Sequence, residues 1–172
     1  MHDGKTCTLD ANGTCAGIFC KKPNVQYVED EEFVLRIFLH PKHYDLHSKT
    51  IKPEAFSRNE FFDKGFSVDR QILVRSLEDY KKIIDNYLRG QAKREKNKGK
   101  DVPALGCICR LNAKDVRSTC DDIFFCPSSS EKRLSHADIR SNPEPYAEWN
   151  EIRESLSNIC DLCSVEDFFE QD

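Results

Sequence analysis

At 172 residues, the chain is long enough for one domain with a hydrophobic core and too short for two large ones. Hydrophobic residues make up 38% of it and charged residues 33%, which leaves enough Phe, Ile, Leu and Val for a core and excludes wholesale disorder. The net charge of −4 excludes a global attraction to nucleic acid or to anionic membranes, so any such contact needs a local basic patch.

The sequence contains no apolar run of the roughly 20 residues that a membrane-spanning helix needs. Its first residues, Met1 to Cys7, lack the apolar core of a signal peptide. We therefore expect a cytoplasmic protein with no membrane contact. Because the cytosol is reducing and the nine cysteines are an odd number, we expect thiols or metal ligands and not a disulfide framework.

Residues 1–30 are rich in turn-forming residues and show no periodicity, so we expect an irregular, cysteine-containing arm. Residues 31–172 are expected to form a single domain. Its first strong element is 33–39, whose two apolar faces are typical of a central strand. The strand is expected to end at His40-Pro41, because proline cannot donate to a strand ladder.

The segment that follows, 40–62, reads as a long connection with a short helix near Pro53, and 66–68 predicts a second strand. The clearest helix is expected to begin after Ser76, which would cap it. Its apolar stripe at helical spacing consists of Leu77, Tyr80, Ile84 and Tyr87. Gly90 is expected to end or weaken this helix, and a mobile basic loop is expected near 91–102.

Three further strands are predicted at 104–111, 122–126 and 134–140, and Asn112 is expected to cap a short helix after the first of them. The last helix is expected to carry an apolar stripe of Trp149, Ile152, Leu156, Ile159 and Cys163. Clustered short strands with helices at intervals predict a compact α+β domain with a small mixed or antiparallel sheet. One mid-chain helix and one C-terminal helix complete it.

Three histidines form the first candidate site. His40, His43 and His47 are spaced i, i+3 and i+7, which would align them on one helical face and could bring two imidazoles to a metal. The alternative is a polar loop whose histidines make ordinary hydrogen bonds. We favour that alternative, because the spacing matches no zinc signature.

The cysteines offer a second candidate site. Cys160 and Cys163 form a CxxC motif, and a structural zinc site usually combines two such pairs. With the remaining ligands expected from the arm, the candidate zinc ligands are Cys7, Cys15, Cys20, Cys160 and Cys163. The alternative is that Cys160 and Cys163 fill the apolar face of the last helix. A thioredoxin-type function is disfavoured, because the motif lies at the end of a helix and not at its start.

A basic segment after the mid-chain helix is the third candidate, since it could bind phosphate groups in a salt-sensitive manner. Its cations are Lys93, Arg94, Lys96, Lys98 and Lys100. Glu95 and Asp101 dilute the charge, and no aromatic residue is interleaved for base stacking. We therefore favour a solvated charge run over a nucleic-acid contact.

The fourth candidate is a dispersed set on or just beyond predicted strands: Arg36, His40, His43, Ser67, Arg70 and His136. Strand ends on one side of a sheet can bring such residues into one cleft. The arginines would bind phosphate groups there, and a histidine would act as general acid or base near neutral pH. The alternative is that Arg36 and Arg70 pair with carboxylates of the chain.

The same residues carry a resemblance. His40-Pro41-x-His43, Ala55-Phe56, Ser67-Val68-x-Arg70 and His136-Ala137-x-Ile139 resemble the HPxH…AF…SVxR…HAxI skeleton of a widespread family of small bacterial proteins. The likeness covers residues 33–140. It implies a common core and a common cleft, and it carries no established activity.

Three functions are compatible with these features. We favour a binding or accessory domain with a protein partner, as a component of a bacterial antiviral defence or conflict system, because no complete catalytic signature is present. The second is an enzyme that acts on a phosphorylated substrate, NAD or RNA, through the histidine and arginine cleft. The third is a zinc-stabilised nucleic-acid binder that uses the basic segment.

Overall fold

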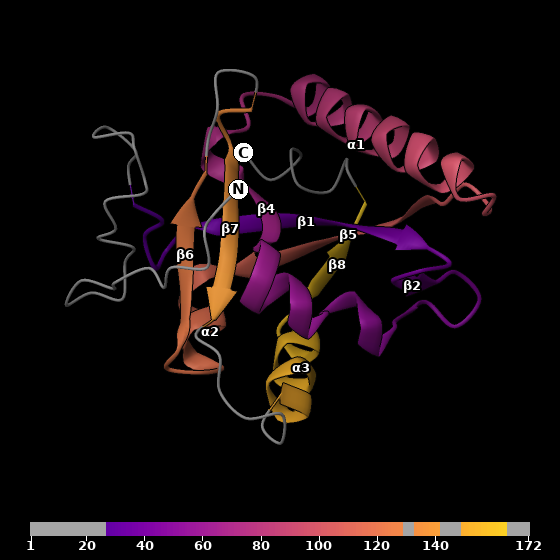
Figure 1. Ribbon diagram of the computed structural model, residues 1–172. Helices are drawn as coiled ribbons and strands as arrows, with labels where there is room; N and C mark the ends of the chain where they lie inside the picture. Colours follow the sequence, from indigo (N-terminus) through magenta and orange to yellow (C-terminus); the bar gives the residue numbers. More distant parts are fainter. Residues whose placement is uncertain (1–26, 129–132, 142–148, 165–172) are drawn as a thin grey trace.

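A six-stranded antiparallel sheet is the centre of the computed structural model, which describes residues 27–128, 133–141 and 149–164 (Figure 1). Its strands are β1 (Phe33–His40), β4 (Phe66–Arg70), β5 (Ala104–Asn112), β6 (Ile123–Pro127), β7 (His136–Ser141) and β8 (Asp161–Cys163). Their spatial order is β6-β7-β4-β1-β5-β8. Together with the helices below, this sheet confirms the predicted α+β domain.

Among the residues that the structure describes, three α-helices accompany the sheet: α1 (Leu77–Asn97), α2 (Ala113–Ser118) and α3 (Trp149–Asn158). Both predicted caps are confirmed. The Ser76 side chain accepts from the Asp79 N–H at 3.2 Å, and the Asn112 side chain accepts from the N–H groups of Lys114 and Asp115 in α2. The shorter elements are β2 (Tyr44–Asp45), β3 (Thr50–Ile51), η1 (Pro53–Ala55), η2 (Glu60–Lys64) and η3 (Gln71–Leu73).

Both faces of the sheet carry hydrophobic cores, and different helices cover them. On one face α1 packs against β1 and β5; the buried side chains there include Leu35, Ile37, Leu39, Tyr80, Ile84 and Ile108. On the other face α2, α3 and η2 cover a core whose aromatic members include Phe38, Phe56, Phe61, Phe66, Phe125 and Trp149. In Figure 1, α1 lies at the top of the view and α3 at the bottom. This coverage explains why 34–39 is buried throughout.

Helix α1 continues through Gly90 to Asn97, so the expectation that Gly90 ends it is wrong. A glycine inside a helix costs about 1 kcal/mol relative to alanine, and the strong helix formers on both sides outweigh this penalty. The expected basic loop at 91–102 is correspondingly shorter, because residues 91–97 are helical. The lysines and arginine from 93 to 96 therefore project from a rigid helix.

The CxxC motif also differs from the prediction. Helix α3 ends at Asn158, and Cys163 lies in the short strand β8, where it pairs with Ile108 of β5. Cys163 is therefore not part of the apolar stripe of α3. Its partner Ile108 belongs to the core beneath α1, so Cys163 lies on the sheet face opposite to α3.

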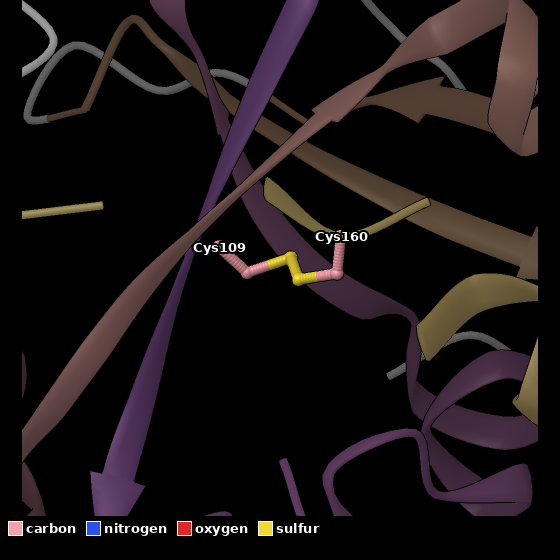
Figure 2. The surroundings of a disulfide bond; sticks show 2 residues. All are labelled: Cys109 and Cys160. Carbon is pink, nitrogen blue, oxygen red and sulfur yellow. A yellow bond between two sulfur atoms is a disulfide. The ribbon is translucent and has the colours of Figure 1, made fainter. Parts of the chain in front are cut away.

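A disulfide bond joins Cys109 of β5 to Cys160, which precedes β8 (Figure 2). The two Cα atoms are 5.6 Å apart, within the usual range for bridged cysteines. The expectation that the cysteines remain thiols is therefore wrong for this pair. The bridge fastens the C-terminal end of α3 to the sheet beside the edge strand β8, which pairs through only three residues.

A buried ion pair joins the residue before β1 to the last residue of β4. Arg70 donates from Nε to Glu32 Oε2 at 2.9 Å and from Nη2 to Glu32 Oε1 at 2.5 Å. The same Nη2 reaches the Tyr27 carbonyl at 2.7 Å, and Glu32 also accepts from the Glu29 N–H. Because both charges are almost fully buried, each depends on the other for compensation.

Replacing Glu32 with Gln is expected to lower the free energy of unfolding by about 3–5 kcal/mol, because the Arg70 guanidinium would remain buried without its counter-charge. Urea denaturation measures this change. The matched control is Lys82→Gln in the exposed Lys82–Asp79 pair, which should leave the midpoint nearly unchanged, since exposed ion pairs contribute little. Equal midpoints for the Glu32 variant and the wild type would contradict the prediction.

Reduction of the disulfide is expected to lower the free energy of unfolding by about 2–4 kcal/mol, because the unfolded chain would regain the freedom of the loop it closes. Dithiothreitol should shift the urea midpoint of the wild type and of Cys163→Ala. It should not shift the midpoint of Cys160→Ala, which lacks the bridge. A reductant effect of the same size in all three proteins would show that the bridge is not its source.

Candidate functional site

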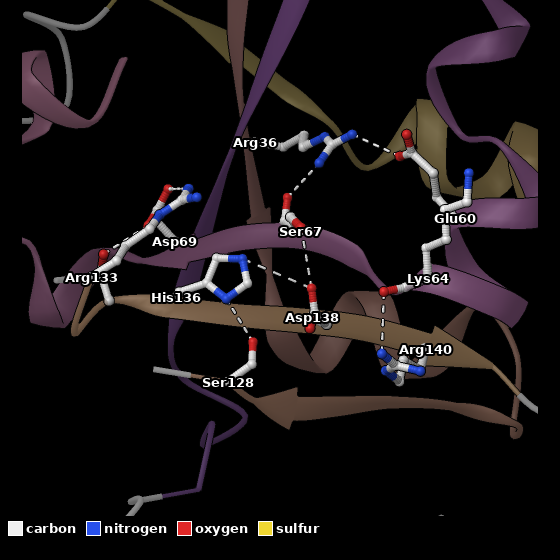
Figure 3. Close-up of polar contacts among 11 residues, drawn as sticks. Arg36, Glu60, Lys64, Ser67, Asp69, Ser128, Arg133, His136, Asp138 and Arg140 are labelled. Atoms are coloured by element: carbon white, nitrogen blue, oxygen red, sulfur yellow. Dashed lines mark hydrogen bonds and ion pairs between the residues drawn. The ribbon is translucent and has the colours of Figure 1, made fainter. Parts of the chain in front are cut away.

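Arg36 lies where β1 and β4 separate. The two strands pair only at Val34–Arg70 and Leu35–Asp69. Beyond that point Arg36 donates from Nη1 to the Ser67 carbonyl at 2.6 Å and from Nη2 to Glu60 Oε2 at 2.7 Å (Figure 3). Its guanidinium also lies 4.1 Å from the centre of the Phe66 ring. The side chain thus replaces the missing ladder bonds and joins β1, β4 and η2.

A row of polar side chains follows β4 and β7 on the α1 face of the sheet. Asp69 is the cross-strand partner of Leu35, which packs under α1, so the two share that face. Asp69 pairs in turn with His136, and Ser67 pairs with Asp138. We call these four residues, Ser67, Asp69, His136 and Asp138, the polar row.

The members of the polar row contact one another at Asp138. Ser67 Oγ donates to Asp138 Oδ1 at 3.2 Å, and His136 Nε2 lies 3.9 Å from the same oxygen. Gly65 allows the chain to pass beside this carboxylate. A Cβ at Gly65 would lie 2.7 Å from Asp138 Cβ, and its φ of +88° is one that residues with side chains rarely adopt.

Asp69 fastens the segment before β7 to the polar row. It is 1% exposed, and it accepts from Arg133 Nε at 2.9 Å and from Ser135 Oγ at 2.7 Å. Arg133 Nη2 bonds to the second carboxylate oxygen, which makes the pair bidentate. Arg133 is therefore held in one orientation beside β4.

A cleft of about 380 Å³ lies between α1 and this part of the sheet. Its lining from the sheet side includes Leu35, Arg36, Glu60, Lys64, Gly65, Ser67, Asp69 and Arg133, and from α1 it includes Asn86, Tyr87, Gly90, Gln91 and Arg94. Four of these side chains are cationic and two are carboxylates. The carboxylates, Glu60 and Asp69, already bond to Arg36 and Arg133, so the cleft carries an excess of positive charge from Lys64 and Arg94.

The structure brings together three of the six residues of the dispersed set: Arg36, Ser67 and His136. Arg36 contacts Ser67 directly, and Ser67 connects to His136 through Asp138. Arg70 lies elsewhere, in its ion pair with Glu32. This agrees with the alternative prediction that this arginine pairs with a carboxylate of the chain.

The three histidines at 40, 43 and 47 do not share a helical face, because His40 ends β1 and the others lie in the turns that follow. His40 Nδ1 bonds to the Tyr44 carbonyl at 3.1 Å, and His47 is exposed. His43 is only 2% exposed; its Nδ1 accepts from the Leu39 N–H at 3.3 Å. These are the ordinary hydrogen bonds of the alternative interpretation.

Metal-ligating side chains do not converge within the described part of the chain, where no group of three or more His, Cys, Asp or Glu residues could hold an ion. Of the five candidate zinc ligands, Cys7, Cys15 and Cys20 lie outside the described residues. Cys160 bonds to Cys109. The predicted zinc site stays a prediction that this arrangement does not support.

The basic segment contributes one residue, Arg94, to the lining of the cleft. Lys98 pairs with Glu95 at 3.3 Å. The five cations of this segment lie at the C-terminal end of α1 and just after it, and all of them are exposed. The basic segment therefore matters for the site through Arg94, which lies on the face of α1 that lines the cleft.

Sequence reasoning missed Glu60, Lys64, Asp69, Arg133 and Asp138. A signal was present for two of them: Asp69 and Asp138 each lie two residues from a predicted site residue on the same strand, and therefore on the same face. The others depend on contacts between distant segments, since 64 residues separate Arg133 from Asp69.

No protein family, curated protein or solved structure matches the chain. The resemblance to a family of small bacterial proteins therefore stays a prediction. Among the described helices, none combines the length and apolar composition that crossing a membrane requires.

Stability is expected to depend on pH through His43. Burial, followed by the charges of Arg36 and Lys42, lowers its pKa from 6.5 to about 3. Between these values the unfolded chain binds a proton that the folded chain does not, so stability falls as the pH falls below 6.5. The loss should approach about 1.4 kcal/mol per pH unit.

The measurement is urea denaturation of the wild type and of His43→Asn at a series of pH values. Asn can accept from the Leu39 N–H but does not titrate, so the variant should lose less stability on acidification than the wild type. Parallel curves for the two proteins would assign the acid sensitivity to other groups.

Proposed function

We propose that the cleft binds a small anionic ligand carrying phosphate groups, and that the protein acts as a binding or accessory domain for it. The observation that carries this proposal is the charge of the cleft lining. Glu60 and Asp69 are already bonded to Arg36 and Arg133, whereas Lys64 and Arg94 add two further cations at the same cleft.

The hydrogen-bonding state of Arg36 supports this proposal. The residue is 6% exposed, and its Nε atom is buried without a hydrogen-bond partner among the described residues. A buried donor of this kind costs free energy unless it finds an acceptor. An anionic oxygen in the cleft would be near a guanidinium group that Glu60 and Ser67 already hold in position.

The size of the cleft and the placement of its cations also fit a small ligand. A volume of about 380 Å³ falls in the range of small-molecule sites. The two added cations come from different elements, Lys64 from η2 and Arg94 from α1, so a ligand between them would contact both sides. Arginine and lysine together provide the fork and the point charge that phosphate groups use.

The proposal keeps three predictions made from the sequence. They are the cytoplasmic location, the protein partner and the place in a bacterial defence system. The nucleic-acid reading is less favoured than a small ligand, because Arg94 is the residue of the basic segment that lines the cleft.

Sodium pyrophosphate is the probe for this proposal, with binding measured by isothermal titration calorimetry. Replacing Lys64 and Arg94 with Gln in one protein should weaken binding at least about tenfold, since hydrogen bonds to charged groups contribute about 1.5–3 kcal/mol. The affinity of the wild type should also fall with added sodium chloride.

The matched control is Lys93→Gln, which changes the charge of the neighbouring exposed residue on α1 and should leave the affinity unchanged. Absence of heat with the wild type at millimolar pyrophosphate would refute the proposal. An equal loss of affinity in Lys93→Gln would also refute it, because general surface charge would then explain the binding.

A further inference from the structure

The first residue after β6 lies beside the imidazole of the polar row. The Ser128 N–H donates to the His136 carbonyl at 3.2 Å, which extends the β6–β7 ladder by one residue. Ser128 and His136 are thus cross-strand neighbours with side chains on the same face. Ser128 Oγ lies 2.6 Å from His136 Nδ1 (Figure 3).

The two side chains differ in exposure. Ser128 is exposed, whereas the His136 side chain is 18% exposed. A hydroxyl group that solutes can reach is therefore bonded to an imidazole that the protein largely shields. Nucleophile and base in hydrogen-bond contact, with the base oriented by a third group, are the arrangement that nucleophilic catalysis requires.

The burial of His136 favours a neutral imidazole that can accept the serine proton. Burial is the main influence and lowers the pKa of His136 below its usual value of 6.5. Arg133 also lowers this pKa, while Asp138 and Asp69 oppose the change. His136 is the one residue of the polar row that can serve as a base near neutral pH.

Asp138 can orient this base. Its Oδ1 lies 3.9 Å from His136 Nε2 and favours the tautomer with hydrogen on Nε2, which leaves the Nδ1 lone pair directed at Ser128. Asp138 is itself positioned by the bond from Ser67 Oγ at 3.2 Å. The sequence of contacts is therefore Ser67 to Asp138, Asp138 to His136, and His136 to Ser128.

We propose that Ser128 is a nucleophile, His136 its general base and Asp138 the orienting carboxylate, and that the substrate is a carboxylic ester of an anionic molecule. The anionic part would occupy the cleft, because Asp69, the cross-strand partner of His136, and Arg133 belong to the cleft lining. The assignment of the substrate class rests on the proposed function; the assignment of the nucleophile does not.

The reaction proceeds in two steps, acylation of Ser128 and hydrolysis of the acyl-enzyme. Ser128 Oγ attacks the ester carbonyl carbon while its proton passes to His136 Nδ1. The imidazolium then gives that proton to the leaving alkoxide oxygen as the carbon–oxygen bond breaks, which produces an alcohol and acyl-Ser128. In the second step water attacks the acyl carbon, and His136 transfers the water proton to Ser128 Oγ, which releases a carboxylic acid and restores the serine.

A neutral alkyl fluorophosphonate is the probe for the nucleophile. Attack by Ser128 forms an oxygen–phosphorus bond and breaks the phosphorus–fluorine bond, with fluoride leaving and the serine proton passing to His136. Intact-mass and peptide mass spectrometry of the folded full-length protein should show one adduct, on Ser128. Ser128→Ala should remain unlabelled, and Ser118→Ala, which removes another exposed hydroxyl, should label like the wild type.

His136→Gln should reduce the labelling rate about 100-fold, with circular dichroism and thermal unfolding used to verify that the variant is folded. The labelling rate of the wild type should fall as the pH drops below the lowered pKa of His136 and be constant above it. Failure of the wild type to label, labelling at another serine, or an unchanged rate in His136→Gln would overturn the assignment.

The substrate class is tested with p-nitrophenyl acetate and the monoanionic p-nitrophenyl succinate. The wild type should hydrolyse the succinate ester with at least a tenfold higher kcat/KM. The Lys64→Gln, Arg94→Gln double variant should lose this preference, and the control variant Lys93→Gln should keep it. Labelling without a preference would overturn the substrate class and leave Ser128 as the nucleophile; pyrophosphate binding without labelling would overturn the nucleophile and leave the proposed function intact.

Discussion

The separation of β1 from β4 after two residue pairs determines how the site is built. A sheet that continued its ladder here would leave no room for the Arg36 side chain between the strands. Because the ladder stops at Leu35–Asp69, the backbone of Ser67 needs another partner, and the guanidinium of Arg36 provides it. The same side chain reaches Glu60, so a gap in backbone pairing becomes a fixed junction of β1, β4 and η2.

Three ion pairs, each with at least one largely buried member, hold this half of the sheet: Arg36–Glu60 and Arg133–Asp69 at the cleft, and Glu32–Arg70 away from it. Transferring such charges out of water costs several kcal/mol for each ion, and the pairing largely offsets this cost without adding much net stability. Their main contribution is to fix the relative positions of the segments that they join. Each pair joins segments that lie far apart in the sequence, and a mispaired arrangement would leave a charge buried alone.

The strands and caps were predictable because they depend on local patterns. A short run with two apolar faces identified β1, and Ser76 and Asn112 were recognisable as caps because an N-cap needs only residues within one turn. The end of α1 was not predictable from the sequence, because the free-energy cost of Gly90 in a helix competes with the helix propensity of its neighbours. The histidines at 40, 43 and 47 fit a helical period, but β1 extends to His40 and the turns after it set a different geometry.

The candidate site was also partly predictable, because some of its residues follow from local patterns. Arg36, Ser67 and His136 stood out by residue type, and the period of a strand places Asp69 and Asp138 beside them. Which arginine enters the cleft could not be read from sequence. Arg36 and Arg70 both lie on strands next to the site, and only the contacts with Glu60 and Glu32 separate a cleft residue from a structural one.

The bond between Cys109 and Cys160 has a mechanical consequence. A force applied to the two ends of the chain would travel along β5 to Cys109 and cross directly to Cys160, bypassing the segment between them. That segment spans a sequence separation of 51 and contains α2, β6, β7 and α3. Fully extended, this segment would measure roughly 170 Å. While the disulfide is intact, pulling on the chain ends cannot extend it. The covalent path between the chain ends thus bypasses the hairpin that carries His136 and Asp138, which stays attached to the strained part of the chain through its pairing with β4.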